Sequence, residues 1–427
     1  MYTDLKYFID NAPLIDTHEH LNKNSEWTEA GPDILQDLFG NYVTADLHTA
    51  GASSEAIKAL MDPESGDFAE RFTGIKPAWE AIQFTGYAEA VSILAHEIYG
   101  IKSFNNSELE NAQESLKTWQ RPDGRLHLLR DKANIDHVQI DDFCWECFPD
   151  DSGQNFFLYD LSWAGFCKGE IDVIPLFKHT NIDVTNLSSL REAMDKLFLL
   201  YGPNAIAVKS QHAYSRTLYW QERSDDDAAS VLDRLLSGKE LDKKERLLLG
   251  DWCWARGIEL AIKYNLPFKI HTGYYAGNNR MPVDRIRSGN LTSLLSQYTE
   301  CRFVLMHISY PYSNELIALT KHFRNVWVDL CWAWSIDPYS STEFVRRFIH
   351  TAPINKIFSF GGDTRWPTSA LAYSIQARRW LSRALGSEVK DGLLRETQAI
   401  EIAERLMFRN QHDCFDIEGT QSNIENT

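Results

Sequence analysis

Short apolar runs recur along the chain, and segments with apolar residues spaced three and four apart separate them. The runs predict eight β-strands, over residues 13–18, 135–143, 171–177, 205–208, 267–270, 303–306, 326–330 and 357–360. Helices are expected between them, among others over 187–201, 283–298, 314–323, 342–350, 368–385 and 393–408. Strands that alternate with helices predict an α/β protein with a parallel sheet, and with eight units a closed (β/α)8 TIM barrel is the economical arrangement. An open doubly wound sheet is the alternative. No Gly-x-Gly-x-x-Gly motif follows a predicted strand, so a dinucleotide site is not expected.

The segment between the first two predicted strands has no convincing strand pattern. From about residue 31 to 118, charged and apolar residues alternate with helical spacing. We expect a helical insertion after strand 1 that lies as a cap over the site, within a single domain covering residues 1–427. Residues 120–124 predict a turn after the insertion, and the polar residues 419–427 are expected to fray.

Composition narrows the class of protein. Of the 427 residues 44% are hydrophobic, which allows a large buried core, and the formal net charge is −17. This net negative charge argues against nucleic acid and anionic membranes as partners, because both are themselves negatively charged. The first residues lack the pattern of a secretory leader, no apolar run is long enough to span a bilayer, and seven scattered cysteines suit a reducing compartment. We therefore expect a cytoplasmic protein.

Two histidines, His18 and His20, stand one residue apart at the end of the first predicted strand. Residues i and i+2 of a strand point to the same face, so the two imidazoles would aim at one point, where a divalent metal is the usual occupant. Such a pair also occurs by chance or at the end of a strand without any function. The ends of later strands decide between these interpretations.

Further ligand-type side chains follow other predicted strands. Lys209 ends the fourth strand, His271 the fifth, His307 the sixth and Asp363 the eighth. The active site of a TIM barrel lies at the carboxyl ends of its strands, so these side chains are expected to converge. A buried histidine without function explains any one of them, but it does not readily explain the whole set.

These motifs resemble the amidohydrolase superfamily, in the amidohydrolase-related branch that contains uronate isomerases, aromatic-acid decarboxylases and many hydrolases. The resemblance runs from His18 to about Asp416. Besides the His-x-His pair, it rests on His271 in Lys-Ile-His-Thr-Gly, His307 in Leu-Met-His-Ile and Asp363 in Gly-Gly-Asp-Thr-Arg. It implies an enzyme that acts on a small molecule and, by analogy, a homo-oligomer.

The resemblance also implies the ligands of a metal centre. The first metal would be bound by His18, His20, Asp363 and His271, while His307 would bind a second metal or polarise the substrate. Lys209 would be carboxylated and bridge two metals, because a free ammonium cannot ligate a cation. The alternative is a lysine that pairs with a carboxylate or binds a substrate anion. One or two ions per chain are expected, with zinc as the first choice and manganese, iron or nickel as alternatives.

Metal-dependent hydrolysis is the leading functional hypothesis. A metal-bound water with a pKa of about 7 would attack a C–N or C–O bond of a small, carboxylate-bearing substrate. Asp363 would be the general base, and His307 would help to polarise the carbonyl group. The alternatives are isomerisation of a uronic acid, metal-dependent decarboxylation, and a non-enzymatic barrel with a vestigial site.

Four residues close to the strand ends are candidates for substrate contacts. The planar guanidinium of Arg365 or Arg216 suits a carboxylate, although either could form a structural salt bridge instead. Tyr274 and Trp332 would lie on loops above the metal, where they contact the substrate or pack under the cap.

Overall fold

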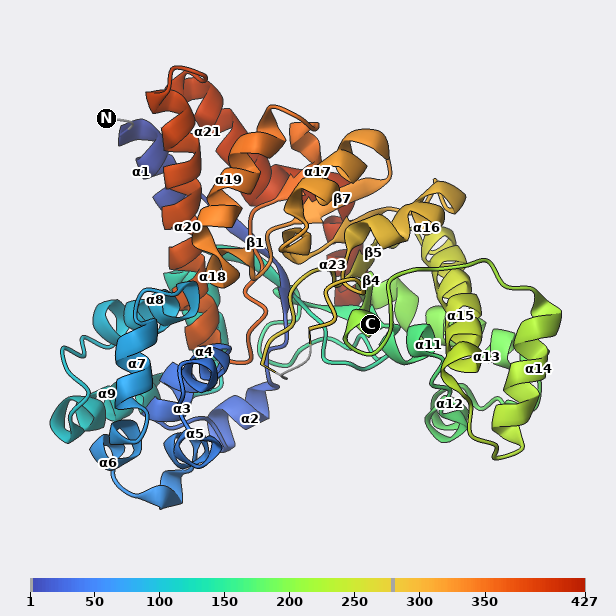
Figure 1. Cartoon of the computed structure of the whole chain (residues 1–427), viewed down its shortest axis with the longest axis horizontal. Helices are drawn as coiled ribbons and strands as arrows, with labels where there is room; N and C mark the ends of the chain where they lie inside the picture. The colour runs from blue at the N-terminus through green and yellow to red at the C-terminus, as the bar shows by residue number, and fades with distance from the viewer. Residues whose placement is uncertain (1–2, 278–280, 427) are drawn as a thin grey trace.

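The computed structural model describes residues 3–277 and 281–426 of the chain. Strands lie near the centre of the molecule, and helices flank them on the left, above and on the right in Figure 1. Eight parallel strands pair in chain order. They are β1 (Leu14–Glu19), β2 (Ile135–Ile140), β3 (Phe157–Ser162), β4 (Ala205–Ser210), β5 (Phe268–Ile270), β6 (Phe303–Leu305), β7 (Val326–Asp329) and β8 (Ile357–Phe358).

Backbone hydrogen bonds between β1 and the segment after β8 close the ring. The Thr17 N–H donates to the Phe360 carbonyl (3.1 Å), and the Asp363 N–H donates to the His18 carbonyl (3.0 Å). The predicted (β/α)8 barrel is therefore confirmed. The closure also brings the end of β1 against the turn after β8, two segments that are far apart in sequence.

The predicted third strand is wrong. Residues 171–177 lie mostly in helix α12 (Val173–Thr180), whose first turn is capped by the Asp172 side chain. Ile174 and Phe177 face solvent on this helix, so the apolar run does not mark a buried strand. The third strand is instead β3, where the buried Asp160 interrupts the apolar pattern. A salt bridge to Lys269 on β5 offsets the cost of burying this carboxylate. Because Lys269 is distant in sequence, a local sequence pattern does not reveal it.

The insertion after β1 is helical, as predicted. Its helices gather on one side of the barrel, blue to teal in Figure 1. They are α2 (Asn24–Glu29), α3 (Ile34–Phe39), α4 (Val43–Thr49), α5 (Ser54–Met61), α6 (Phe68–Thr73), α7 (Lys76–Ile82), α8 (Gly86–Ser92) and α9 (Asn106–Trp119). A hydrogen bond from the Gly124 N–H to the Arg121 carbonyl forms the predicted turn before α10 (Gly124–Leu126).

The remaining helices flank the barrel or follow its strands. They are α1 (Thr3–Asn11), α11 (Ala164–Lys168), α12, α13 (Leu187–Tyr201), α14 (Asp225–Leu236), α15 (Lys243–Lys263), α16 (Thr292–Gln297), α17 (Ser313–His322), α18 (Ala333–Ile336), α19 (Pro338–Ile349), α20 (Pro367–Lys390), α21 (Glu396–Glu404), α22 (Asn410–Cys414) and α23 (Ile417–Glu425). None of the helices within the described ranges is long and apolar enough to cross a membrane.

The expectation that residues 419–427 fray is wrong for the part that the structure describes, which excludes Thr427. Helix α23 buries Ile417, Thr420 and Ile424. Ile417 and Ile424 join an apolar cluster with inward side chains of the strands, such as Ile15 and Val304. These apolar side chains fill part of the barrel interior, and the site of a TIM barrel is built at the carboxyl ends of its strands.

Candidate active site

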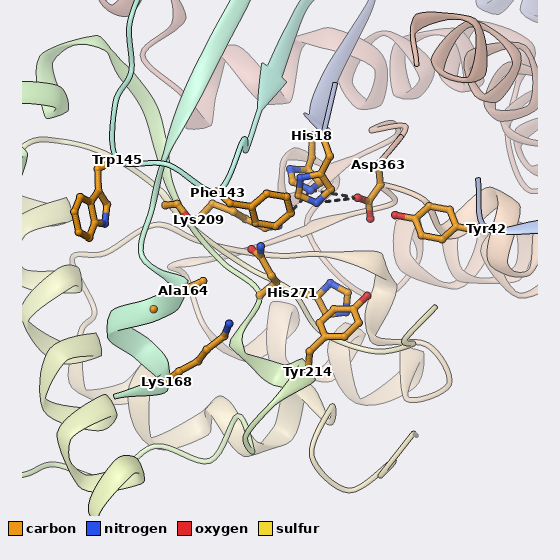
Figure 2. A pocket seen from close by; sticks show the side chains of 14 residues that line it. His18, Tyr42, Phe143, Trp145, Ala164, Lys168, Lys209, Tyr214, His271 and Asp363 are labelled. Atoms are coloured by element: carbon orange, nitrogen blue, oxygen red, sulfur yellow. Dashed lines mark hydrogen bonds and ion pairs between the residues drawn. The ribbon is translucent and has the colours of Figure 1, made fainter. Parts of the chain in front are cut away.

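His18, His20 and Asp363 meet at the carboxyl end of the barrel, and Figure 2 shows His18 beside Asp363. The Nε2 atoms of His18 and His20 lie 3.4 and 3.3 Å from the same oxygen, Asp363 Oδ1. The two histidines leave β1 on one face, and the barrel closure carries Asp363 to them. The structure thus brings together three residues that the sequence predicts as metal ligands, in a group able to hold an ion.

Burial sets the charges of this group. It lowers the pKa of His18 well below the ordinary value, and the nearby positive charge of Lys209 lowers it further. It also lowers the pKa of His307 to about 4. Burial alone would raise the pKa of Asp363, but the contact with His18 and the neighbouring His20 and His307 hold it well below its usual range. Neutral imidazoles beside an ionised carboxylate are the protonation states that bind a divalent cation.

Unpaired polar atoms in the group also fit a metal. Asp363 Oδ1 and His307 Nε2 are buried without a hydrogen-bond partner in the described structure. Such atoms are rare in folded proteins, because losing water without gaining another partner is costly. A cation bound to Asp363 Oδ1 would satisfy that atom, and His307 Nε2 also needs a ligand. The residues present therefore fit the divalent metal that the sequence predicts.

Backbone carbonyls fix the orientation of the imidazoles. His20 Nδ1 lies 2.6 Å from the Asp141 carbonyl, and His307 Nδ1 lies 2.9 Å from the Cys331 carbonyl. Both rings thereby turn their Nε2 atoms toward Asp363. His271 differs, since its Nε2 lies 3.1 Å from the Tyr274 carbonyl and only its Nδ1 is left for a metal. Its ring centroid is 4.4 Å from that of His307, so the structure keeps it in the cluster.

Lys209 also reaches the cluster. Its buried Nζ lies 3.2 Å from His18 Nε2 and 3.9 Å from Asp141 Oδ2. The contact with Asp141 agrees with a free ammonium paired with a carboxylate, and the contact with His18 places it at the edge of the metal position. Carboxylation of Lys209 remains a prediction.

An open cavity of about 490 Å³ leads to the cluster. Its lining combines aromatic rings with polar side chains, among them Tyr42, Phe143, Trp145, Ser162, Lys168, Gln211 and Tyr214. The Phe143 ring stacks on His20 with a centroid distance of 4.5 Å. Lys168 extends from α11 toward the middle of the cavity in Figure 2, and its nearest carboxylate, Glu170, is 3.9 Å away. The cavity wall therefore carries an ammonium that is only weakly neutralised.

The two predicted arginine contacts lie elsewhere. Arg216 is buried, and its guanidinium donates to the Cys167 carbonyl (3.0 Å) and the Tyr219 carbonyl (3.1 Å) and forms an ion pair with Asp251. Arg365 is exposed. Neither residue is among the described side chains that line the cavity.

The two predicted aromatic contacts pack beside the cavity. Trp332 is buried, with its ring 4.3 Å from that of Tyr42 and 5.4 Å from that of His307. The ring of Tyr274 lies 6.0 Å from Trp332. These two residues thus support the site, and their predicted contacts with a substrate remain untested.

Sequence reasoning missed Lys168 and Tyr42, two of the polar residues that line the cavity. Lys168 follows β3, and misplacing that strand hid its position at a strand end. Tyr42 precedes α4 within the insertion, where the pattern of the sequence does not show which residues face the barrel. The correct third strand was the one signal that could have indicated Lys168.

Comparisons with known proteins agree with this geometry. A family model described as amidohydrolase matches residues 221–397. The chain is 24% identical over 229 residues to protein fluG of Emericella nidulans. The matched residues make up 50% of this chain and 26% of fluG. The chain is also 25% identical over 250 residues to a uronate isomerase of Cutibacterium acnes. Here the matched residues make up 55% of this chain and 52% of that protein. The matched part thus spans about half or less of these relatives' length.

The fold extends the likeness over the whole barrel. The crystal structure of uronate isomerase from Thermotoga maritima superimposes with a TM-score of 0.79, covering 97% of each chain at 15% sequence identity. At this identity the superposition shows a shared fold. Together with the amidohydrolase family model over residues 221–397, it confirms the predicted resemblance to the amidohydrolase superfamily and its uronate isomerase branch.

Proposed function

We propose that this protein is a metal-dependent isomerase that interconverts the aldose and ketose forms of a uronic acid. The observation that carries the proposal is a cavity with a metal-ligand cluster at its floor and the ammonium of Lys168 on its wall. The uronate isomerases among the similar proteins support this alternative over the hydrolysis that the sequence analysis placed first.

Substrate binding in this proposal depends on the cavity wall. The ammonium of Lys168 would pair with the substrate carboxylate, an interaction that Glu170 at 3.9 Å only weakly opposes. The rings of Phe143 and Trp145 would pack against the C–H groups of the sugar. The hydroxyl end of the substrate would then reach His18, His20 and Asp363.

The reaction moves a proton from C2 to C1 and consumes no water. A divalent metal held by His18, His20 and Asp363 would supply Lewis acidity toward substrate oxygens. The ionised Asp363 carboxylate would accept the proton of the C2 hydroxyl and return it to the C1 oxygen. The Tyr42 hydroxyl points toward Asp363 in Figure 2. Burial raises the pKa of Tyr42 well above its ordinary value, so this hydroxyl stays protonated and is available to donate a hydrogen bond to a substrate oxygen.

The test compares charged and neutral sugars. Metal-loaded protein is incubated with D-glucuronate, D-galacturonate and the matching hexoses, and ketose formation is followed by nuclear magnetic resonance. We expect at least one hexuronate to be converted and the hexoses to be far poorer substrates. Lys168→Met should raise KM for the hexuronate by about 10- to 100-fold, the worth of a hydrogen bond to a charged group. Lys178→Met, on the exposed face of α12, is the control. A protein that converts neither hexuronate would contradict the proposal.

Hydrolysis remains a second candidate because of Lys209. Its Nζ lies 3.2 Å from His18 Nε2, where a carbamate would place an oxygen ligand beside the metal position. On this alternative, reconstitution with metal and ¹³C-labelled bicarbonate should produce a carbamate resonance that Lys209→Met abolishes. Absence of that resonance from the metal-loaded wild-type protein would remove the observation that favours hydrolysis.

A further inference from the structure

A second group of ligand-type atoms lies beside the first. His307, Cys331 and Asp363 are buried, and one ligand atom of each lies within 4.8 Å of the others. Cys331 follows β7, so it belongs to the same ring of strand ends as the histidines. The sequence pattern around this cysteine does not indicate a role for it.

Asp363 belongs to both groups, and its two oxygens face different ligands. Oδ1 lies 3.4 Å from His18 Nε2 and 3.3 Å from His20 Nε2. Oδ2 lies 3.8 Å from His307 Nε2. A carboxylate with one oxygen toward each group is arranged to bridge two cations, as carboxylates do in sites that hold two metals close together.

His307 supplies an independent indication of a ligand. Its ring is fully buried, and Nε2 has no hydrogen-bond partner in the part of the chain that the structure describes. The Cys331 carbonyl holds the opposite nitrogen, Nδ1, at 2.9 Å and so fixes the direction of Nε2. Cys331 thus orients the histidine through its backbone and offers a sulfur through its side chain.

We propose that His307, Cys331 and Asp363 form a second metal position, joined to the first through the Asp363 carboxylate. One imidazole, one thiolate and one carboxylate make a soft ligand set, which favours zinc, cadmium or cobalt over magnesium and manganese. Binding at this position releases the thiol proton of Cys331 as the metal–sulfur bond forms, because the thiolate is the ligand. In this arrangement a second metal does not require carboxylation of Lys209.

Occupancy of this position has a consequence for the isomerase reaction, and this consequence alone rests on the proposed function. A second cation on Oδ2 would occupy the Asp363 oxygen that does not face His18 and His20. Less of the carboxylate would then be free to accept a proton from the substrate. Zinc beyond the first equivalent should therefore slow ketose formation, and Cys331→Ser should weaken this inhibition.

Cobalt provides a direct test, because a thiolate bound to Co²⁺ produces a charge-transfer absorption that nitrogen and oxygen ligands do not. Metal-free protein is titrated with Co²⁺ while absorption and bound metal are measured. We expect the band to develop with the second equivalent and to be absent in Cys331→Ser, which still binds the first equivalent. Serine keeps the backbone carbonyl that orients His307, so the comparison isolates the sulfur. Cys253→Ser, a buried cysteine on α15, should retain the band.

Two results would overturn the inference. One is binding of a single cobalt ion, and the other is a charge-transfer band that survives in Cys331→Ser. X-ray absorption of wild-type protein with two equivalents of zinc keeps the inference testable even if Cys331→Ser does not fold. It should detect a sulfur neighbour of zinc, and a spectrum with nitrogen and oxygen neighbours alone would contradict the second position. Neither measurement uses a substrate, so failure here is distinct from failure of the proposed isomerase activity.

Discussion

The buried ion pair between Lys269 and Asp160 allows a quantitative prediction. The Lys269 ammonium lies inside the barrel, fully buried, and donates to both Asp160 oxygens (2.8 and 2.9 Å) and to the Thr17 carbonyl (2.8 Å). Lys269→Met keeps the length of the side chain and removes its charge and its three hydrogen bonds. Asp160 is then left as a buried carboxylate without its cation.

Removal of one partner from a buried pair lowers the free energy of unfolding by about 3–5 kcal/mol. This decrease in the free energy of unfolding depends on pH, because it depends on whether Asp160 is ionised. Burial raises the pKa of Asp160 to about 6, even though Lys269 opposes the rise, and the Lys269→Met change removes that opposition. A carboxyl whose pKa is higher in the folded state destabilises the fold when it is ionised and ceases to do so when it is protonated. The deficit should therefore be largest at pH 8 and shrink toward pH 5.5.

Urea unfolding of metal-free protein, followed by tryptophan fluorescence at both pH values, measures this deficit. Lys263→Met, an exposed lysine at the end of α15, is the matched control and should change the free energy of unfolding by less than about 0.5 kcal/mol. Addition of Asp160→Asn to Lys269→Met should recover part of the loss, because no charge is then buried. A deficit below about 1 kcal/mol at pH 8, or one that does not change with pH, would refute the reasoning.

Two further variants test how the site is held. In Gly362→Ala the new Cβ would lie 2.0 Å from Glu19 Oε1, so the Glu19 carboxyl group, which accepts a hydrogen bond from Thr364 beside Asp363, must shift. Metal titration should show affinity for the first metal at least about tenfold lower, as for other changes to groups that support metal ligands. An unchanged affinity would argue against a fixed Asp363. Asn410→Ala removes hydrogen bonds to the Ile354 and Ile357 carbonyls at the start of β8, and thermal unfolding should show a loss of about 2 kcal/mol. KM should not change, and a large rise in KM would mean that Asn410 acts on the site itself.

The sequence predicts most of the barrel because its strands are buried on both faces. Strands such as β4 and β6 are short, almost uniformly apolar and flanked by helices, which is the pattern of a parallel sheet. The missed strand β3 carries Asp160, and the residue that makes this polar position tolerable lies 109 residues further along the chain. A local pattern holds no information on such a partner.

The same limit applies to the site. His18 and His20 are predictable because strand geometry places residues i and i+2 on one face. Arg216 also stands next to a strand end, but Asp251 and nearby carbonyls hold its guanidinium away from the cavity. Lys168 and Tyr42 reach the cavity from segments that only the folded chain brings there. Sequence spacing therefore indicates the candidate metal ligands, whereas contacts between distant segments decide which side chains line the cavity.

The dependence of isomerisation on bound metal tests the central claim most directly. Metal-free protein is reconstituted with measured amounts of zinc or manganese, and ketose formation from a hexuronate is measured against metal bound per chain. The account predicts no conversion without metal and a rate that rises in proportion to metal up to one equivalent. Conversion by metal-free protein, or no conversion of any hexuronate at any metal content, would contradict it.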